Sequence, residues 1–86
     1  MPTKNVHWKS HQQLIQLLIF TRKEAGLTQT ELGQRVGKGQ KFISLIERGQ
    51  RRVDVLEFCV LAKAMGHDPL DLFADLLPKL PKKIEI

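Results

Sequence analysis

Apolar side chains recur every three or four positions through most of the 86 residues, a spacing typical of helices that bury one face. Glycine or proline interrupts this pattern between the apolar segments. A chain of this length has room for one small core, so we expect one domain with an all-α fold, a compact five-helix bundle. The pattern places the helices over residues 10–25, 40–48 and 55–65, with shorter ones from Thr28 to Gly37 and from Asp68 to Pro78.

Capping residues support these boundaries. Thr28 is a favourable N-cap, and Glu31 three positions later completes a capping box. Asp54 is a candidate cap for the fourth helix, and Asp68 followed by Pro69 is a typical start for the fifth. Three helices are each followed by a glycine, which adopts the left-handed conformation of a helix end at little cost: Gly37, Gly49 and Gly66.

The second and third predicted helices are short and separated by a tight turn. Leu32 and Val36 share one face of the second helix. Phe42, Ile43 and Ile46 can face inward from the third. Gly33 lies inside the second helix, where glycine costs about 1 kcal/mol relative to alanine. Close approach of the next helix would explain that cost. Such a pair is the usual way in which a small protein places one helix in the major groove of DNA.

The third helix has an outward face of mixed chemistry. Glutamine and lysine side chains there can donate hydrogen bonds to base edges, whereas a leucine offers only apolar contact, for example to a thymine methyl group. The residues left facing outward are Gln40, Lys41, Ser44, Leu45 and Arg48.

The positive charge coincides with this helix. The chain has 14 basic and 9 acidic residues, a net charge of +5. A basic cluster alone is usually a solvated surface, but one that overlaps a helix pair of this kind indicates contact with phosphates. Residues 35–52 contain six basic residues and one acidic residue, Glu47, so their net charge of +5 equals that of the whole chain. The basic residues are Arg35, Lys38, Lys41, Arg48, Arg51 and Arg52.

Two sequence motifs resemble the lambda-repressor-like helix-turn-helix family of the Xre/Cro/C1 type. They are Gly26-Leu-Thr-Gln-Thr-Glu-Leu32 and Phe42-Ile-Ser-Leu-Ile-Glu-Arg-Gly49, with Gly37 between them. The resemblance extends from about Leu14 to Phe73. It implies a DNA-binding transcriptional regulator, a repressor that acts as a homodimer on a palindromic operator.

The resemblance also implies roles for single residues. Gln40 matches the glutamine that contacts adenine, and Gln29 matches the one that binds a phosphate and supports it. Lys41 and Leu45 match other base-contacting positions, and Ser44 is a further candidate. The phosphate-contacting candidates are Gln29, Lys38, Arg48, Arg51 and Arg52.

Other matched positions have structural roles. Arg22 and Glu47 match an arginine and a glutamate that form a partly buried ion pair. The last helix often forms the dimer interface in this family, which makes Phe73, Leu76 and Leu77 the interface candidates. For Phe73 a place in the core of its own chain is an equal alternative.

Two residues of the turn depart from the family pattern. Lys38 stands where an apolar residue is usual, and its aliphatic stem could lie over Phe42 while its ammonium reaches solvent or phosphate. Gly39 replaces the usual serine or threonine cap of the third helix, at a cost of a few tenths of a kcal/mol. The resemblance therefore predicts that the third helix exists but does not fix its exact pitch.

The sequence predicts one domain with a short segment at each end. We expect a flexible N-terminus over residues 1–9, the DNA-binding domain over residues 10–77 and a tail over residues 78–86. In the tail, Ile84 and Ile86 alternate with charged residues, so it is either disordered or a short strand that pairs with another subunit. The first helix is apolar nearly all round and is either fully covered or a surface for a partner chain.

No residues suggest catalysis, a cofactor or a metal site. Cys59 is the only cysteine and lies among apolar residues, as a structural thiol would. His7 and His11 are four apart, but no third ligand lies near them, and zinc needs at least three. No segment resembles a membrane span or a signal peptide, so we expect a cytoplasmic protein that is not an enzyme.

The sequence leaves a second function open. In the first function, that of a transcriptional regulator, a homodimer binds double-stranded DNA. The alternative is an antitoxin or adaptor module whose main partner is another protein, a toxin or another regulator, bound through the first helix and the tail.

Overall fold

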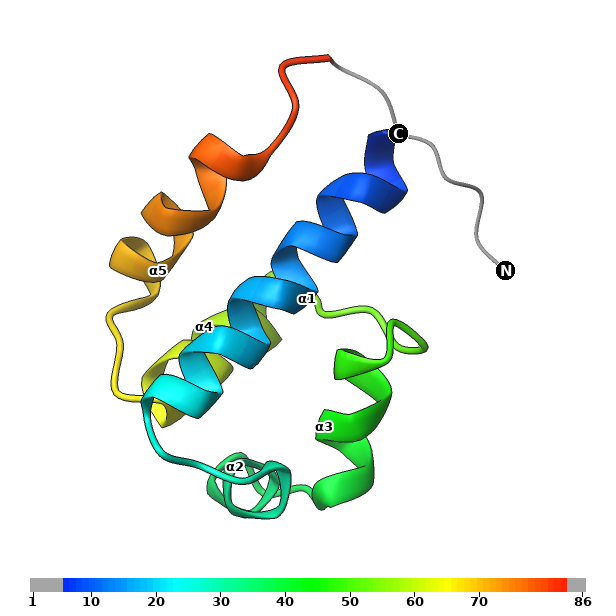
Figure 1. Cartoon of the computed structure of the whole chain (residues 1–86). Coiled ribbons are helices and arrows are strands. Elements are labelled where there is room, and N and C mark those ends of the chain that lie inside the picture. Colours follow the sequence, from blue (N-terminus) through cyan, green and yellow to red (C-terminus); the bar gives the residue numbers. More distant parts are fainter. Residues whose placement is uncertain (1–5, 84–86) are drawn as a thin grey trace.

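The computed structural model describes residues 6–83 and shows five helices and no strand among them (Figure 1). The all-α prediction is therefore confirmed. The elements are α1 (Val6–Glu24), α2 (Gln29–Arg35), α3 (Gln40–Glu47), α4 (Val55–Ala64), α5 (Pro69–Leu76) and a 3₁₀ turn, η1 (Leu77–Lys79).

The predicted side-chain caps are present at the starts of α2, α4 and α5. Thr28 accepts a hydrogen bond from the Glu31 amide, and the Glu31 carboxylate accepts one from the Thr28 amide. Asp54 caps α4, and Asp68 caps α5 ahead of Pro69. The glycines that end α2, α3 and α4 all have φ between +74° and +84°. Local sequence signals therefore determine where these helices begin and end.

The start of α1 was predicted wrongly. This helix begins at Val6 rather than Ser10, so residues 6–9 are helical and do not belong to a flexible N-terminus. The reason is a tertiary contact, because the Trp8 ring packs against Gly49, where an added Cβ would lie 3.2 Å from Trp8 Cη2. Residues 1–5 lie outside the described part of the chain.

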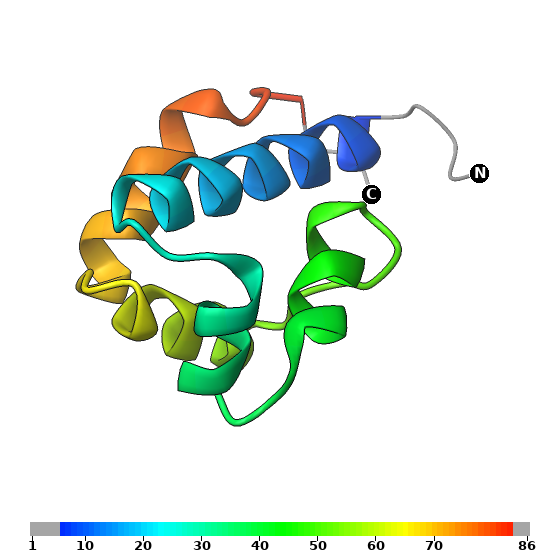
Figure 2. The same ribbon diagram turned by 60° about the horizontal axis from the view of Figure 1, so that its bottom comes forward.

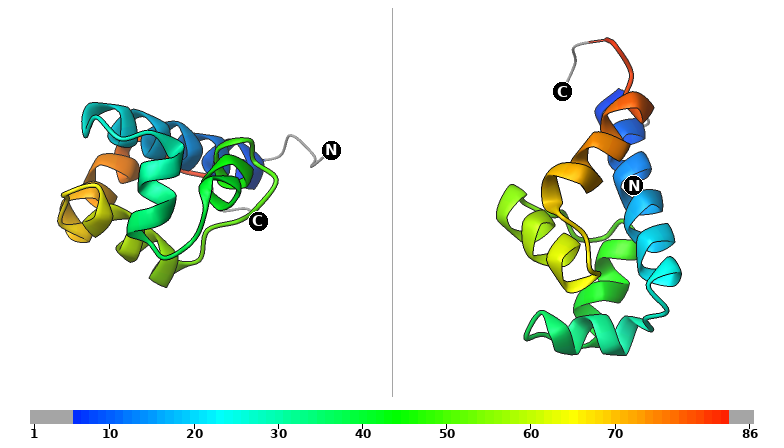
Figure 3. Two further views of the ribbon diagram at one scale, coloured as in Figure 1. Left: turned by 90° about the horizontal axis from the view of Figure 1, so that it is seen from below. Right: turned by 90° about the vertical axis from the view of Figure 1, so that its left-hand side faces the viewer.

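The core lies between α1 and the other four helices. Figures 2 and 3 show α1 extending across the molecule, with α5 beside it and α2 at one end. Among residues 6–83, no helix is long and apolar enough to cross a membrane. The buried core residues are Leu17, Leu18, Leu27, Leu32, Ile43, Ile46, Leu61, Ala62, Met65, Leu72 and Leu76.

Leu76 corrects one interface prediction. It is only 6% exposed and belongs to the core of its own chain, because Leu72 and Leu76, one turn apart, face inward together. Phe73 of α5 and Leu77, the first residue of η1, stay 43% and 50% exposed.

The predicted start of the tail at residue 78 also needs correction. Pro78 ends the α-helix but lies within η1, and Leu80 beyond it packs against the core. The folded domain therefore extends past residue 77. The possible strand at Ile84 and Ile86 lies outside the described residues.

Candidate nucleic-acid interface

The turn between α2 and α3 depends on a close backbone approach. A Cβ on Gly33 would lie 2.5 Å from the Gly39 carbonyl oxygen, closer than any side chain permits. Gly39 caps α3 with extended backbone and no side-chain hydrogen bond. The interior glycine of α2 is therefore required by the backbone of the turn, which sets the position of α3 against α2.

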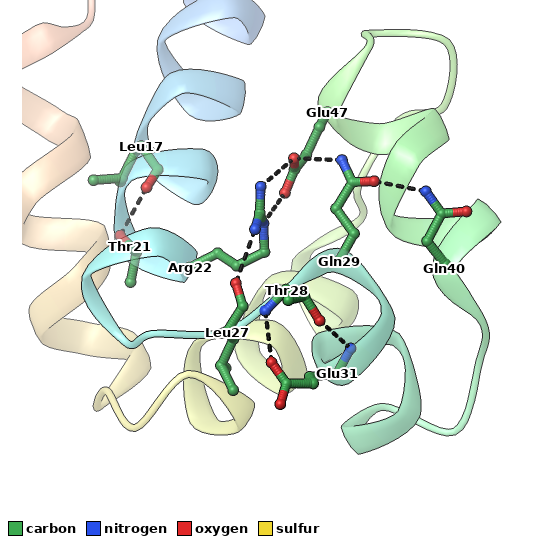
Figure 4. Close-up of polar contacts among 9 residues, drawn as sticks. All are labelled: Leu17, Thr21, Arg22, Leu27, Thr28, Gln29, Glu31, Gln40 and Glu47. Carbon is green, nitrogen blue, oxygen red and sulfur yellow. Dashed lines mark hydrogen bonds and ion pairs between the residues drawn. The ribbon is translucent and has the colours of Figure 1, made fainter.

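A buried ion pair fixes the inner side of α3. Arg22 Nε donates to Glu47 Oε2 at 2.7 Å, and Arg22 Nη2 donates to Glu47 Oε1 at 3.0 Å (Figure 4). A third donor, Arg22 Nη1, bonds the Leu27 carbonyl at 2.8 Å. The two side chains are 10% and 8% exposed, so α1 and α3 are joined by charges shielded from water.

Two glutamines continue this network to the surface. Gln29 Nε2 donates to Glu47 Oε1 at 2.9 Å, and Gln40 Nε2 donates to Gln29 Oε1 at 2.7 Å (Figure 4). The direction of each bond follows from Glu47, whose carboxylate can only accept. The Gln29 side-chain amide must therefore direct its NH2 group toward Glu47 and its oxygen toward Gln40. Gln40 keeps one N–H and its carbonyl oxygen for an outside partner.

The outward face of α3 carries the predicted base-contacting residues. Gln40 and Lys41 are exposed, and Ser44 and Leu45 are half-buried. Ile43 and Ile46 point the other way and are 1% and 2% exposed. Arg48, which ends the helix, is exposed and lies over its last turn, with Nε 3.4 Å from the Ser44 carbonyl.

Arg51 does not have the free side chain expected of a phosphate-contacting residue. Its Nη1 and Nη2 donate to Glu57 Oε1 and Oε2 at 2.9 and 2.8 Å, and Nη1 also reaches the Arg52 carbonyl at 2.8 Å. The Arg51 guanidinium and the Asp54 amide both bond Glu57 and lower its pKa to about 2. The pair is therefore fully charged at neutral pH.

Of the remaining basic residues, Lys38 and Arg35 contact other parts of the protein, whereas Arg52 is exposed. The Lys38 ammonium lies over the Phe42 ring, with Nζ 5.8 Å from the ring centre, where only the aliphatic stem was expected. Arg35 bonds the Ala64 carbonyl at 2.9 Å and so joins α2 to the end of α4. Arg52 is exposed and makes no hydrogen bond through its side chain among residues 6–83.

Two residues of this region were missed in the sequence. Glu57 lies three positions after the Asp54 cap, and this spacing could have predicted a second capping box, which the structure contains. Nothing local predicts that Trp8 lies beside Gly49. Within residues 6–83, no three His, Cys, Asp or Glu side chains gather to hold a metal ion.

Comparisons with known proteins identify the same helix pair, α2 and α3. The helix-turn-helix family model matches residues 20–72. A curated relative, the uncharacterized HTH-type transcriptional regulator y4dJ of Sinorhizobium fredii, is 41% identical over 51 residues, which are 59% of this chain and 66% of that protein.

Solved structures are similar over most of the chain. An XRE-family like protein from Pseudomonas syringae pv. tomato is 39% identical, with a TM-score of 0.82 over 88% of this chain and 93% of that one. The restriction-modification controller protein C.AhdI from Aeromonas hydrophila is 31% identical, with a TM-score of 0.70 over 78% of this chain and 97% of that one. The family match spans more than half of the chain and includes α2, the turn and α3, so the chain belongs to the XRE-type (Cro/C1) helix-turn-helix family of transcriptional regulators, DNA-binding proteins that are not enzymes.

Proposed function

We propose that this protein is a repressor that binds a palindromic operator as a homodimer. Helix α3 of each subunit lies in the major groove, with the two half-sites about 34 Å apart, one turn of the duplex. The observation that carries the proposal is the bonded orientation of Gln40 on the exposed face of α3. The similarity to a restriction-modification controller protein supports a role in regulation.

Gln40 is suited to adenine. Its free carbonyl oxygen can accept from the adenine N6 amine while its second N–H donates to N7, and the Gln29 bond holds the amide ready for both. Lys41 can donate to guanine O6 or N7, and Ser44 can bond either kind of base. Leu45 can contact a thymine methyl group.

Contacts with phosphates fix the register of α3. Lys38, Arg48 and Arg52 have exposed side chains on or beside α3. Gln29 is half-buried but retains one N–H of its amide after bonding Glu47. Such contacts position the protein on the duplex without reading sequence.

The dimer interface we propose lies on α5 and the first residue of η1, which follows it directly. Phe73 and Leu77 are 43% and 50% exposed, and Leu70 at the start of the helix is 73% exposed. Large apolar side chains that are exposed together on one helix usually mark a protein contact. The Phe73 ring also packs edge-on against Phe58, with 6.2 Å between ring centres, so it is held in place at this surface.

Loss of the Gln40 side chain tests the function. Duplexes selected from a random pool would first define the operator. Gln40→Ala should then weaken binding to the operator by about 1–3 kcal/mol and leave binding to random duplexes nearly unchanged. Gln16→Ala, which removes an exposed glutamine of α1, is the matched control.

Two outcomes would contradict the proposal. An equal loss on operator and random DNA would remove Gln40 as a base-contacting residue. If the wild-type chain bound no duplex at low salt, and bound one only after a second protein was added, the antitoxin or adaptor function would replace the repressor.

A further inference from the structure

Two adjacent arginines in the loop between α3 and α4 have different surroundings. Three N–H groups of Arg51 are bonded within the molecule, two to Glu57 and one to the Arg52 carbonyl. The Arg52 side chain is exposed and faces solvent. Both belong to the basic segment that the sequence assigns to phosphate contact, so their geometry decides which of them is available.

Arg51 is held from a second side as well. Its guanidinium carbon lies 4.6 Å from the centre of the Phe42 ring, on α3. Glu57 accepts from both terminal nitrogens of the guanidinium and also accepts from the Asp54 amide at 3.0 Å. Arg51 therefore connects α3, the loop and the first turn of α4.

The charge of Arg51 is balanced where it lies. A phosphate approaching its remaining N–H groups would also approach the Glu57 carboxylate, because the two charged groups are 2.8 Å apart. Attraction and repulsion then nearly cancel, and releasing Arg51 would leave Glu57 without its bidentate partner. Arg52 has no such counter-charge among the described residues.

We propose that Glu57 masks Arg51 from DNA, so that Arg51 is a positioning residue for the α3–α4 loop while its neighbour Arg52 is the arginine that binds a phosphate. This inference rests on the proposed DNA-binding function and adds a new element to it. Glu57, a residue of opposite charge beside the interface, limits how many phosphates the loop can contact.

The salt dependence of binding tests the mask directly. For B-DNA the slope of log K against log salt changes by about 0.9 for each phosphate contact. The measurement is fluorescence anisotropy of a labelled duplex of random sequence, titrated at several NaCl concentrations. Thermal unfolding by circular dichroism checks that each variant is folded at the temperature used.

Glu57→Gln removes the charge that masks Arg51 and keeps the helix cap. Glutamine can still complete a capping box at this position, but it carries no charge to hold Arg51. We expect the slope to become steeper by about 0.9, an additional fall in affinity of about threefold between 50 and 200 mM salt. Arg52→Gln should make the slope shallower by about 0.9.

The double variant Arg51→Gln with Glu57→Gln is the matched control. It removes one positive and one negative charge together, so its slope should equal that of the wild type. A slope shallower by about 0.9 would show that Arg51 itself binds a phosphate and would overturn the inference. An unchanged slope for Glu57→Gln would overturn it as well.

Failure of the proposed function gives a different result. A wild-type chain without salt-dependent binding to any duplex would overturn DNA binding, and the mask with it. Wild-type binding together with a shallower slope in the double variant would overturn the mask alone.

Discussion

Glu47 controls the orientation of side chains that lie well beyond its own contacts. Its carboxylate accepts from Arg22 and from Gln29, and the orientation of the Gln29 amide then determines which end of Gln40 is bonded. The same carboxylate therefore joins α1 to α3 and, through Gln29, sets the direction of the hydrogen bond that Gln40 makes. In the proposed function, this one buried side chain supports both the fold and the base-contacting residue Gln40.

Glu47→Gln should affect both roles. It leaves the Arg22 charge buried without its counter-ion, and breaking a buried pair costs about 3–5 kcal/mol of stability. Urea unfolding would measure the loss. Glu24→Gln, at the exposed end of α1, should change stability by about 0.5 kcal/mol or less. Similar stabilities for the two variants would show that the ion pair contributes little.

At the scale of elements, the α2–turn–α3 unit is held by backbone packing. Gly33 leaves room for the Gly39 carbonyl, and the capping box at Thr28 starts the helix that carries this glycine. The position of α3 against α2 therefore depends on the absence of a side chain at Gly33.

Gly33→Ala should destabilise the protein although alanine is the better helix former. The added Cβ would lie 2.5 Å from the Gly39 oxygen, and overpacking of this kind costs about 1–3 kcal/mol. Gly39→Ser is the matched change in the same turn, because nothing lies within 4 Å of its new Cβ. It should stabilise the protein by a few tenths of a kcal/mol through a better cap. Urea midpoints that move together would contradict this account.

Helix α4 begins at a charged pair whose effect depends on pH. Glu57 has a pKa of about 2 in the folded protein against an ordinary 4.5, first because of Arg51 and then because of the Asp54 amide. A lowered folded pKa means that the unfolded chain binds the proton more readily. The stabilisation is therefore complete above pH 4.5 and disappears as the pH falls to about 2.

Thermal unfolding at several pH values tests this pair. Between pH 4.5 and 2 the Tm of the wild type should fall more steeply than that of Glu57→Gln, which has no carboxyl group to protonate there. Parallel curves for the two proteins would show that Glu57 is not held by Arg51 in solution.

At the scale of the whole molecule, the proposed DNA-binding surface and the exposed apolar surface lie on different helices. The exposed polar and basic residues belong to α3 and the loop after it, whereas six of the seven large exposed apolar side chains belong to α4, α5 and η1. A dimer formed through α5 would leave α3 of both subunits free for the duplex.

Leu77→Lys should separate such a dimer without unfolding the subunit, because Leu77 is half exposed and lies outside the core. Sedimentation equilibrium would show monomers at concentrations where the wild type is dimeric. Phe20→Lys replaces a side chain of α1 that is 62% exposed and should leave the dimer intact. The reverse result would place the interface on α1.

Much of this fold is determined by interactions within four or five residues of the chain. The caps at Thr28, Asp54 and Asp68 and the apolar spacing of α3 are local, so the sequence alone predicted these helices and the outward face of α3. The family motifs similarly predicted the Arg22–Glu47 pair and the contact between Gln29 and Gln40, and the structure contains both. The bond that joins them, from Gln29 to Glu47, was not predicted.

Only the tertiary structure decided the remaining features, because they depend on contacts between distant segments. Trp8 extends α1 by meeting a glycine 41 positions away, and the packing of α5 buries Leu76 while leaving Leu77 exposed. The path of the loop after α3 brings Glu57 onto Arg51 and leaves Arg52 outside. Periodicity identifies the residues that face one way, but packing determines what they meet.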